Sequence, residues 1–505
     1  MDVMRTAKDL SNHLFLDGKM TSAKGSTFYD VMNPATEEVF GQIAEATDTE
    51  IEEAIEVANR ARKEWFALSA LERAERLHEV AIAFRAASHP VGEMMTREMG
   101  KAFKESSDEV IWGATVTDYY AEIGRHEGGK VFGPAVAGQL HYTVKEPMGV
   151  VVCVMPFNYP VALLMWEAAA ALAAGNAVIV KPSELTSLTT LMLMECFSSL
   201  PAGLIQVVTG GAKVGAKLVA SNRTHMVAFT GSVPAGKAIA SACAEQFKPA
   251  LIEASGNDAF IVMPSAPIDI AARGAVFAAF VNCGQVCTSA ERIYVHEDIY
   301  DQFMERFIFH TKALRVGNGL GATDVGPMAS KRELDRFTAL VNRAVEAGAT
   351  VACGGKRPDG MEKGWFFEPT ILTDVTSDME IVNGESFGPV APVVKISSLD
   401  EAIALANKSA FGLGFNIYTL SLPEAIKASN EVEVGIVWVN APLLDNDAGA
   451  FGGRKLSGLG KELGTEGLDT FQHTKLVMID PEASDQDFWW FPYKSAECFP
   501  EISSR

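Results

Sequence analysis

The chain has 505 residues, of which 48% are hydrophobic and 21% are charged. These values are ordinary for a globular protein of two or three domains, and they exclude a disordered chain, a collagen and a disulfide-stapled miniprotein. The 64 acidic residues outnumber the 43 Lys and Arg residues, which gives a formal net charge of −21. This charge argues against nucleic acids and anionic membrane surfaces as partners, because both require a cationic face.

Cysteine usage and the N-terminal sequence indicate a protein of a reducing compartment. The seven cysteines lie at irregular spacings, with no second close pair and no clustered histidines, so we expect neither a disulfide framework nor a metal site. The first twenty residues contain no apolar run of signal-peptide length. The most apolar stretch, 161–180, is interrupted by Glu167 and Asn176, and predicts a buried helix and strand rather than a membrane span. We therefore expect a cytoplasmic protein without membrane association.

The chain begins with helical patterns and then changes character. In residues 47–65 apolar side chains recur at helical spacing, after Thr47 or Asp48 as the cap. Helical patterns continue to about residue 125. A glycine-punctuated stretch then leads into the alternating segment 139–147 (QLHYTVKEP), which predicts a pair of strands outside the main helical run.

From residue 149, short Val- and Ile-rich runs alternate with segments compatible with helices, from GVVVCVMPF to ALIEASG. This alternation predicts βαβ units and a parallel sheet, whose sites form at the carboxyl ends of the strands. Those ends carry Asn158, Lys181, Ser183, Gly231, Ser232 and Glu253. A second alternating block extends from 259–263 to 435–440. We therefore expect two α/β domains with a cleft between them.

Two cysteines have settings that suit chemistry. Cys287, in NCGQVCTSAER, is flanked mostly by small and polar residues rather than by large core side chains. A nucleophilic cysteine needs a local positive potential that favours its thiolate. An isolated cysteine is more often a buried, inert thiol, and Cys283 has a similar setting, so local sequence hardly separates the two.

A carboxylate and an amide follow the strands of the first block. Glu253 ends the apolar run ALIE, where burial raises its pKa into the range of a general base. A structural ion pair would explain Glu253 equally well. Asn158 lies between two prolines just past a strand, where its side chain can donate to an oxyanion or simply satisfy the turn.

Two segments have features of a nucleotide site. FTGSVPAG at 229–236 follows a strand and opens a helix, where backbone N–H groups can hold a phosphate, although it is not the G-x-G-x-x-G fingerprint. In KPSE at 181–184, Glu184 can accept hydrogen bonds from ribose hydroxyls, or Ser183 can simply cap a helix.

Taken together, these segments resemble the aldehyde dehydrogenase superfamily, in the family's order and at family-like spacing, over about residues 15–480. The matching elements are PFNYP at 156–160, KPSE at 181–184, FTGSVPAG at 229–236, Glu253, GQVCTSAER at 284–292, ESFGPV at 385–390 and FGGRKLSGLGKELG at 451–464.

The resemblance implies an α/β fold with three parts. They are a Rossmann-like cofactor domain (1–126 and 148–255), a second α/β catalytic domain (256–474), and a small β oligomerisation element with the C-terminal tail (127–147 and 475–505). Family members are homodimers or homotetramers, in which this strand pair extends a neighbour's sheet. The aromatic cluster FWWFPY at 488–493 is expected to pack at an interface.

The resemblance also implies roles. Cys287 would attack an aldehyde to form a thiohemiacetal, and Asn158 with the backbone N–H of Cys287 would form the oxyanion hole. Hydride transfer to the nicotinamide leaves a thioester, which water activated by Glu253 would hydrolyse to a free acid. The cofactor contacts would be Pro156, Phe157, Lys181, Ser183, Glu184, Gly231, Ser232, Glu385 and Phe387. Glu184 favours NAD over NADP, because a carboxylate beside the ribose repels a 2′-phosphate, although NADP stays possible.

Two segments depart from the family pattern. After the base, the family usually reads Glu-Leu-Gly-Gly-Lys, whereas this chain reads Glu253-Ala254-Ser255-Gly256-Asn257. Ala450 replaces the usual proline before Phe-Gly-Gly. Neither change removes a catalytic group.

The resemblance places Trp166, Thr288 and Asp118 in the substrate tunnel. Trp166 occupies a position where subfamilies for succinic semialdehyde tend to have an arginine, which argues against that substrate. Aspartates 118, 445 and 447 with nearby aromatic rings suit an amino- or betaine-type aldehyde, unless those aspartates are solvated surface residues. An aliphatic aldehyde stays open, and so does a sulfonated one, for which Arg273, Arg292 or His141 would supply the positive charge.

Two other functions stay open. A CoA-acylating aldehyde dehydrogenase would cleave the thioester with CoA, but such members generally lack the base that Glu253 provides. A non-catalytic structural or binding protein on the same scaffold would have no need of Cys287, Glu253 and Asn158.

Overall fold

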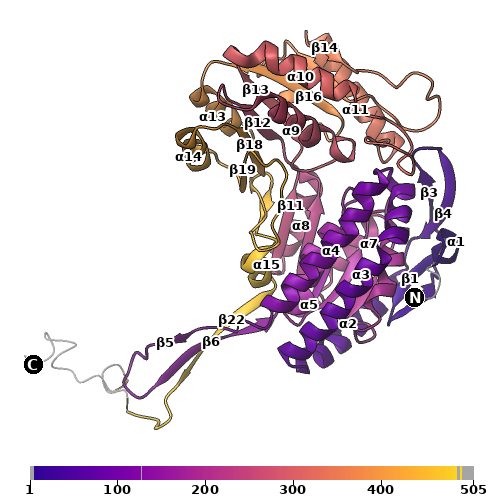
Figure 1. Cartoon of the computed structure of the whole chain (residues 1–505). Helices are drawn as coiled ribbons and strands as arrows, with labels where there is room; N and C mark the ends of the chain where they lie inside the picture. Colours follow the sequence, from indigo (N-terminus) through magenta and orange to yellow (C-terminus); the bar gives the residue numbers. More distant parts are fainter. Residues whose placement is uncertain (1–4, 127, 486–489, 492–505) are drawn as a thin grey trace, which may run out of the picture.

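The computed structural model describes residues 5–126, 128–485 and 490–491. Two large sheets, each flanked by helices, form the body, and a narrow three-stranded arm projects from it (Figure 1). Most of the aromatic cluster at 488–493, like the end of the tail, lies outside the described residues. The α/β fold class predicted from the sequence is confirmed.

The first sheet has eight strands with a parallel centre. Their order is β2 (Lys19–Ser22), β1 (His13–Leu16), β9 (Ile205–Val207), β8 (Ala177–Lys181), β7 (Val150–Val154), β10 (Met226–Gly231), β11 (Ala250–Ala254) and β21 (Gly458–Leu459). Strands β9 to β11 run parallel, as the Val- and Ile-rich runs predicted. The sequence did not predict β21, which returns from the distant 451–464 segment to pair antiparallel with β11.

Helices cover this sheet. They include α2 (Asp48–Ala67), α3 (Ala70–Met99), α4 (Phe103–Ile123), α5 (Ala162–Ala173), α6 (Ser187–Leu193), α7 (Ala212–Ala220) and α8 (Val233–Ala244). Thr47 is the cap of α2, since its hydroxyl accepts a hydrogen bond from the backbone N–H of Glu50, whose carboxylate closes a capping box. Figure 1 shows α3 and α4 side by side, next to α5.

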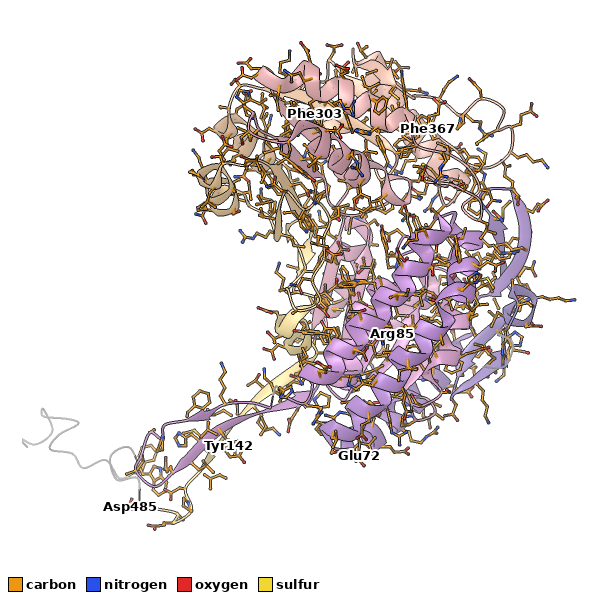
Figure 2. The ribbon with its side chains drawn as sticks, in the orientation of Figure 1. Glu72, Arg85, Tyr142, Phe303, Phe367 and Asp485 are labelled. Carbon is orange, nitrogen blue, oxygen red and sulfur yellow. The ribbon has the colours of Figure 1, made fainter. Side chains whose placement is uncertain are left out.

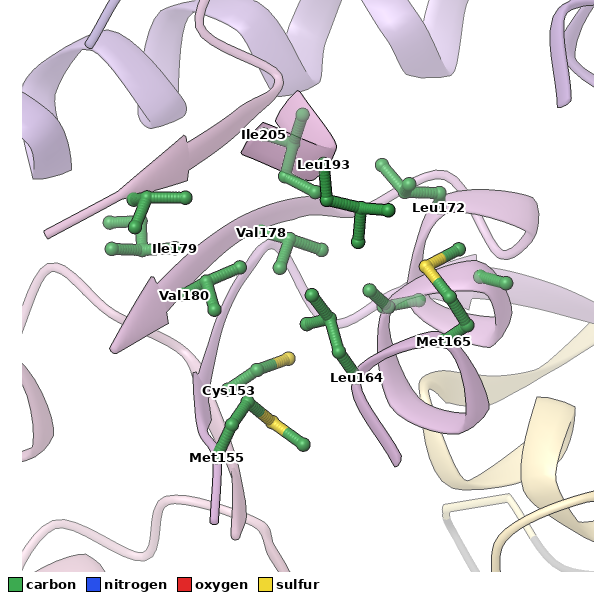
Figure 3. Packing of buried hydrophobic residues seen from close by; sticks show 14 of the residues in the cluster. Cys153, Met155, Leu164, Met165, Leu172, Val178, Ile179, Val180, Leu193 and Ile205 are labelled. Carbon is green, nitrogen blue, oxygen red and sulfur yellow. The ribbon is translucent and has the colours of Figure 1, made fainter. Parts of the chain in front are cut away.

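The apolar stretch 161–180 forms α5 and β8, as predicted. Leu164 and Met165 of α5 pack beside Val178 and Val180 of β8 in the close view of Figure 3. All four are fully buried. Within the described residues, no helix combines the length and apolar character that crossing a membrane requires.

The second sheet has seven strands. Their order is β14 (Thr350–Cys353), β15 (Thr370–Thr373), β16 (Val390–Ile396), β13 (Ala290–His296), β12 (Asp258–Val262), β18 (Gly414–Tyr418) and β19 (Ile436–Val439). Helices α9 (Ile268–Phe280), α10 (Tyr300–Lys312), α11 (Lys331–Glu346), α13 (Leu399–Asn407) and α14 (Leu422–Glu431) flank it. Apart from β21, the strands of the first sheet lie before residue 255, and the second sheet takes its strands from Asp258 onward.

The arm consists of β5 (Val131–Phe132), β6 (Leu140–Pro147) and β22 (Gln472–Ile479). Figure 2 labels Tyr142 on this arm, well away from the helices of the body. The domain boundary expected at residue 475 falls inside β22, which pairs with β6 along its whole length. A strand pair was predicted here, and the third strand comes from a segment more than 300 residues further along the chain.

Candidate active site

The loop that carries Cys287 follows α9 and precedes β13. Asn282 and Cys283 have left-handed backbone angles, with φ of 50° and 57°, and Gly284 follows with φ of 69°. Non-glycine residues rarely adopt this region, and two in succession indicate a turn that its surroundings hold in place. Cys283 is buried, whereas Cys287 is partly exposed. The exposure of the two cysteines therefore differs, and of the two only Cys287 is accessible to a small molecule.

Asn158 lies directly beside this loop. Its Nδ2 donates a hydrogen bond to the carbonyl of Gln285 at 3.1 Å, and Asn282 Nδ2 donates to the carbonyl of Asn158 at 3.1 Å. Among the described residues, no acceptor is hydrogen-bonded to the backbone N–H of Cys287. An N–H group and an amide are therefore available next to the Cys287 thiol, as an oxyanion site requires.

Glu253 lies near the carboxyl end of β11 and is 2% exposed. Neither of its carboxyl oxygens has a nitrogen or oxygen donor within hydrogen-bonding reach among the described residues. Burial raises the pKa of Glu253 well above its usual value, and the charge of Glu462 raises it further. Burial also raises the pKa of the Cys287 thiol, and the adjacent Glu253 carboxylate adds to that shift. The two side chains thus face each other closely enough to perturb each other's ionisation.

Two further buried carboxyls, Glu462 and Glu167, belong to this carboxyl cluster but are not among the predicted site residues. Glu167 of α5 accepts a hydrogen bond from Thr230 at 3.2 Å, and the charge of Glu462 adds to the burial that raises the pKa of Glu167. Burial raises the pKa of Glu462 to about 8. The signal for Glu167 was present, because a carboxylate inside an apolar helix is expensive to bury. Glu462 is brought close only by the return of the chain along β21.

The predicted cofactor residues line the carboxyl edge of the first sheet. Lys181 ends β8, and its Nζ lies 3.6 Å from Glu184 Oε2. Ser232 is the exposed N-cap of α8, and its side chain makes no capping hydrogen bond. Gly231 precedes it at the end of β10. Ser183 accepts a hydrogen bond from the backbone N–H of Leu185 at 3.3 Å within a local turn. It does not cap a helix, because α6 begins at Ser187 with Thr186 as its N-cap.

Residues from the segment just before β16 contact Phe157 and Gly256. Phe157 follows Pro156 directly in the sequence. Its ring contacts the ring of Phe387 edge to face, with the two centroids 5.9 Å apart. Glu385 Oε1 accepts a hydrogen bond from the backbone N–H of Gly256 at 3.3 Å, and burial raises the pKa of Glu385 to about 8. These contacts bring the predicted nicotinamide residues to the same edge as Cys287.

Aromatic rings form one wall near the thiol. Trp166 is 5% exposed and its ring centroid lies 4.8 Å from that of Phe451. Thr288, also buried, follows Cys287 directly. Burial raises the pKa of Tyr159, the neighbour of Asn158, and the charges of Glu105 and Glu109, followed by those of Cys287 and Asp445, raise it further. Burial raises the pKa of Asp445 to about 7.

The structure does not place Asp118 in this wall. Asp118 Oδ1 lies 2.6 Å from His78 Nδ1, and its Oδ2 lies 2.6 Å from Arg85 Nη2. Both partners belong to α3, where Figure 2 labels Arg85. The charge of Asp118 is thus used between two helices, so we correct its predicted tunnel role. Of the candidate aspartates, Asp445 lies near Tyr159, the neighbour of Asn158.

The cations considered for a sulfonated substrate are also placed elsewhere. Arg292 is 5% exposed and donates to the carbonyls of Asn257 at 2.8 Å and Leu405 at 3.1 Å. His141 lies on β6 of the arm, and Arg273 is exposed on α9. Within the described residues, no group of three or more His, Cys, Asp and Glu is arranged to hold a metal ion.

Comparison with known proteins adds an independent line of evidence. Residues 20–477 match the model of the aldehyde dehydrogenase family. A 3,6-anhydro-α-L-galactose dehydrogenase of Vibrio sp. (strain EJY3) is 36% identical over 92% of this chain and 98% of its own. A 3-sulfolactaldehyde dehydrogenase of Pseudomonas putida is 35% identical over 93% of this chain and 97% of its own. The solved betaine aldehyde dehydrogenase of Staphylococcus aureus, in complex with NAD+, superposes with a TM-score of 0.92 at 31% identity, covering 95% of this chain and 97% of its own. The chain belongs to the aldehyde dehydrogenase family and is an NAD(P)-dependent aldehyde dehydrogenase.

Proposed function

We propose that the protein oxidises a small aldehyde to the free carboxylic acid, with Cys287 as nucleophile and Glu253 as the base for hydrolysis. The single observation that carries this proposal is the close approach of the Glu253 carboxyl to the Cys287 thiol, beside the Asn158 amide. A thiol, a carboxyl of raised pKa and two oxyanion donors are the groups that acyl transfer through a thioester requires.

The residues of the chain divide the reaction between them. The Cys287 thiol releases its proton to solvent, and the thiolate sulfur bonds to the aldehyde carbon as the C=O electron pair moves to the oxygen. Asn158 Nδ2 and the backbone N–H of Cys287 stabilise the negative charge on that oxygen. When bound, NAD(P)+ supplies the hydride acceptor that turns the thiohemiacetal into a thioester. Glu253 then takes a proton from water as that water attacks the thioester carbon. The C–S bond breaks, the Cys287 sulfur leaves, and the acid is released.

The edge of the first sheet fits a dinucleotide. The twelve-residue helix α8 begins after the exposed Ser232, whose side chain makes no capping hydrogen bond. The backbone N–H groups at this helix start suit the pyrophosphate of a dinucleotide. Lys181 and Glu184 would face the adenine ribose, and the Glu184 carboxylate favours NAD. Glu385 and Phe387, on the other side, would orient the nicotinamide end.

The aromatic wall favours an uncharged or cationic aldehyde of the aliphatic, amino or betaine type. Trp166 and Phe451 offer apolar faces, and Asp445 adds a carboxyl near Tyr159. A sulfonated aldehyde lacks support here: Arg292 is committed to backbone carbonyls, His141 lies on the arm, and Arg273 is exposed on α9.

The exposed apolar residues of the arm support a homodimer or homotetramer as the assembly. Val131 is 77% exposed and Leu476 is 57% exposed. They lie on β5 and β22, the two outer strands of the arm, and exposed apolar side chains of this kind are typical of a surface that a partner covers. A cytoplasmic location stays a prediction.

Two assays test the proposed function. NADH formation is followed over a panel of aldehydes with NAD and NADP, with and without CoA. We expect turnover without CoA, and an absolute requirement for CoA would favour the acylating alternative. Glu253→Gln is then expected to give one burst of NADH per active site, with steady-state turnover lowered by about 10²- to 10⁴-fold. Asp118→Asn serves as the matched control and should keep normal turnover. Unchanged steady-state turnover in Glu253→Gln would refute the base role.

A further inference from the structure

Three charged residues with no role in the proposed chemistry lie beside the oxyanion site; Lys101 and Glu109 are buried, and Glu105 is partly buried. Lys101 precedes α4 and its side chain is 0% exposed. Glu105 and Glu109 follow on one face of α4, one turn apart. Lys101 Nζ donates a hydrogen bond to Glu109 Oε2 and stands 3.6 Å from the centroid of the Tyr159 ring. Buried charges are costly unless they serve a structural or functional purpose.

Glu109 fixes the Asn158 side of the oxyanion site. Its Oε1 accepts hydrogen bonds from the backbone N–H groups of Val161 at 2.8 Å and Ala162 at 3.1 Å. These donors open helix α5, which has no side-chain cap of its own. A carboxylate from another helix therefore caps α5 and holds the turn that presents Asn158.

Glu105 fixes the Cys287 side. Its Oε2 accepts a hydrogen bond from the backbone N–H of Asn282 at 3.1 Å, at the first of the left-handed residues before Cys287. Asn282 in turn donates to the carbonyls of Asn158 and Gln285. The loop conformation is unfavourable for non-glycine residues, so an external hydrogen bond is needed to keep it populated.

Lys101 connects the two sides. It is hydrogen-bonded to Glu109, its positive charge lowers the pKa of Glu105 against the raising effect of burial, and it covers the ring next to Asn158. We propose that Lys101, Glu105 and Glu109 form a positioning unit that sets the placement of Asn158 relative to Cys287. The proposal rests on the proposed oxyanion hole, and none of the three residues is assigned contact with the reacting atoms.

The test compares two variants, one that changes the charge of the Glu105 side chain and one that changes its length. Glu105→Gln keeps a carbonyl oxygen at the same distance from Asn282 and loses the charge. Glu105→Asp keeps the charge and shortens the side chain by one methylene. If Glu105 positions the loop through its hydrogen bond, Glu105→Asp should slow the pre-steady-state NADH burst by about 10- to 100-fold. Glu105→Gln should stay within about threefold of the wild type by the same argument.

Further readouts distinguish positioning from a general loss of structure. The KM for NAD should stay within about twofold in both variants, because the cofactor edge is built from other elements. Thermal unfolding monitors the fold, and Glu122→Gln, on the exposed end of the same helix, is the matched control. Lys101→Met is a second probe and should also slow the burst at unchanged KM for NAD.

The outcomes are distinct. Equal burst rates in Glu105→Asp, Lys101→Met and wild type would overturn the positioning role, and so would a slow Glu105→Gln beside a normal Glu105→Asp. If the wild-type protein itself formed no NADH with any aldehyde, in single-turnover or steady-state measurements, the proposed function would fail instead, before the variants are compared.

Discussion

A Cβ atom placed on Gly256 would lie 2.0 Å from the carbonyl oxygen of Cys287. The segment that follows Glu253 therefore passes directly against the backbone of the proposed nucleophile. This contact explains why the second glycine of the family pattern is retained at position 256. A side chain there would collide with the backbone of Cys287, which cannot move aside as a side chain could. Position 255, where a serine replaces the first glycine, faces other surroundings, and its carbonyl accepts a hydrogen bond from Ser457 at 2.8 Å.

Gly256→Ala should accordingly disrupt the site, whereas Ser255→Gly should not. The added methyl must displace the Cys287 carbonyl, and over-packing of this kind typically costs about 1–3 kcal/mol. We expect kcat/KM for the best aldehyde to fall by about 100-fold or more, since small misplacements of reacting groups have effects of this size. Ser255→Gly is the matched control, and its kcat/KM should stay within about twofold. Equal kcat/KM values in the two variants would contradict the contact.

The ionisation of Cys287 depends on its carboxylate neighbour, which leads to a second prediction. The Glu253 carboxylate raises the pKa of the Cys287 thiol beyond the effect of burial. Removing that charge in Glu253→Gln should lower the thiol pKa, so that more thiolate is present at any given pH. The rate of iodoacetamide labelling, measured against pH without cofactor, should therefore rise at lower pH in the variant. A midpoint that stays in place or moves upward would show that the two side chains do not interact as described.

The cofactor edge gives a third prediction. Glu184→Gln removes the carboxylate that would repel a 2′-phosphate, while Lys181, 3.6 Å away, is kept. Because Glu184 is partly exposed, its effect is screened, and we expect kcat/KM for NADP relative to NAD to rise by about 5- to 10-fold. Glu38→Gln, on an exposed strand away from this edge, is the control. A ratio unchanged from that of the wild type would remove Glu184 as the determinant of cofactor choice.

The sequence allowed the parallel sheet and the neighbours of Cys287 to be predicted because their signals are local. Strand ends carry Asn158, Lys181 and Glu253, and parallel strands bring their carboxyl ends to one edge. Asp118 was misplaced because its partners lie on another helix, 33 and 40 residues away along the chain. Glu462 was missed because a strand of only two residues, β21, brings it to Glu253.

Glu98, on the buried side of α3, supports a final prediction about pH and stability. Its carboxyl oxygens accept hydrogen bonds from the backbone N–H groups of Leu188 at 2.8 Å and Thr189 at 2.7 Å. Burial nonetheless raises the pKa of Glu98 to about 7 in the folded protein, whereas an unfolded chain has a glutamate pKa of about 4.3. Between these values the folded state binds more protons than the unfolded state. The free energy of unfolding should therefore fall as pH rises through this window, by at most about 1.4 kcal/mol per pH unit for this one group.

Glu98→Gln removes this titration but keeps an acceptor for one backbone donor. We expect urea unfolding of the variant to depend less on pH between about 5 and 7 than that of the wild type. The difference in free energy of unfolding, variant minus wild type, should accordingly become more positive as pH rises, reaching a change of roughly 2 kcal/mol by pH 8. Other buried carboxyls, such as Glu385, titrate equally in both proteins and cancel in this difference. Parallel curves for the two proteins across this range would mean that Glu98 ionises as freely in the folded state as in the unfolded chain.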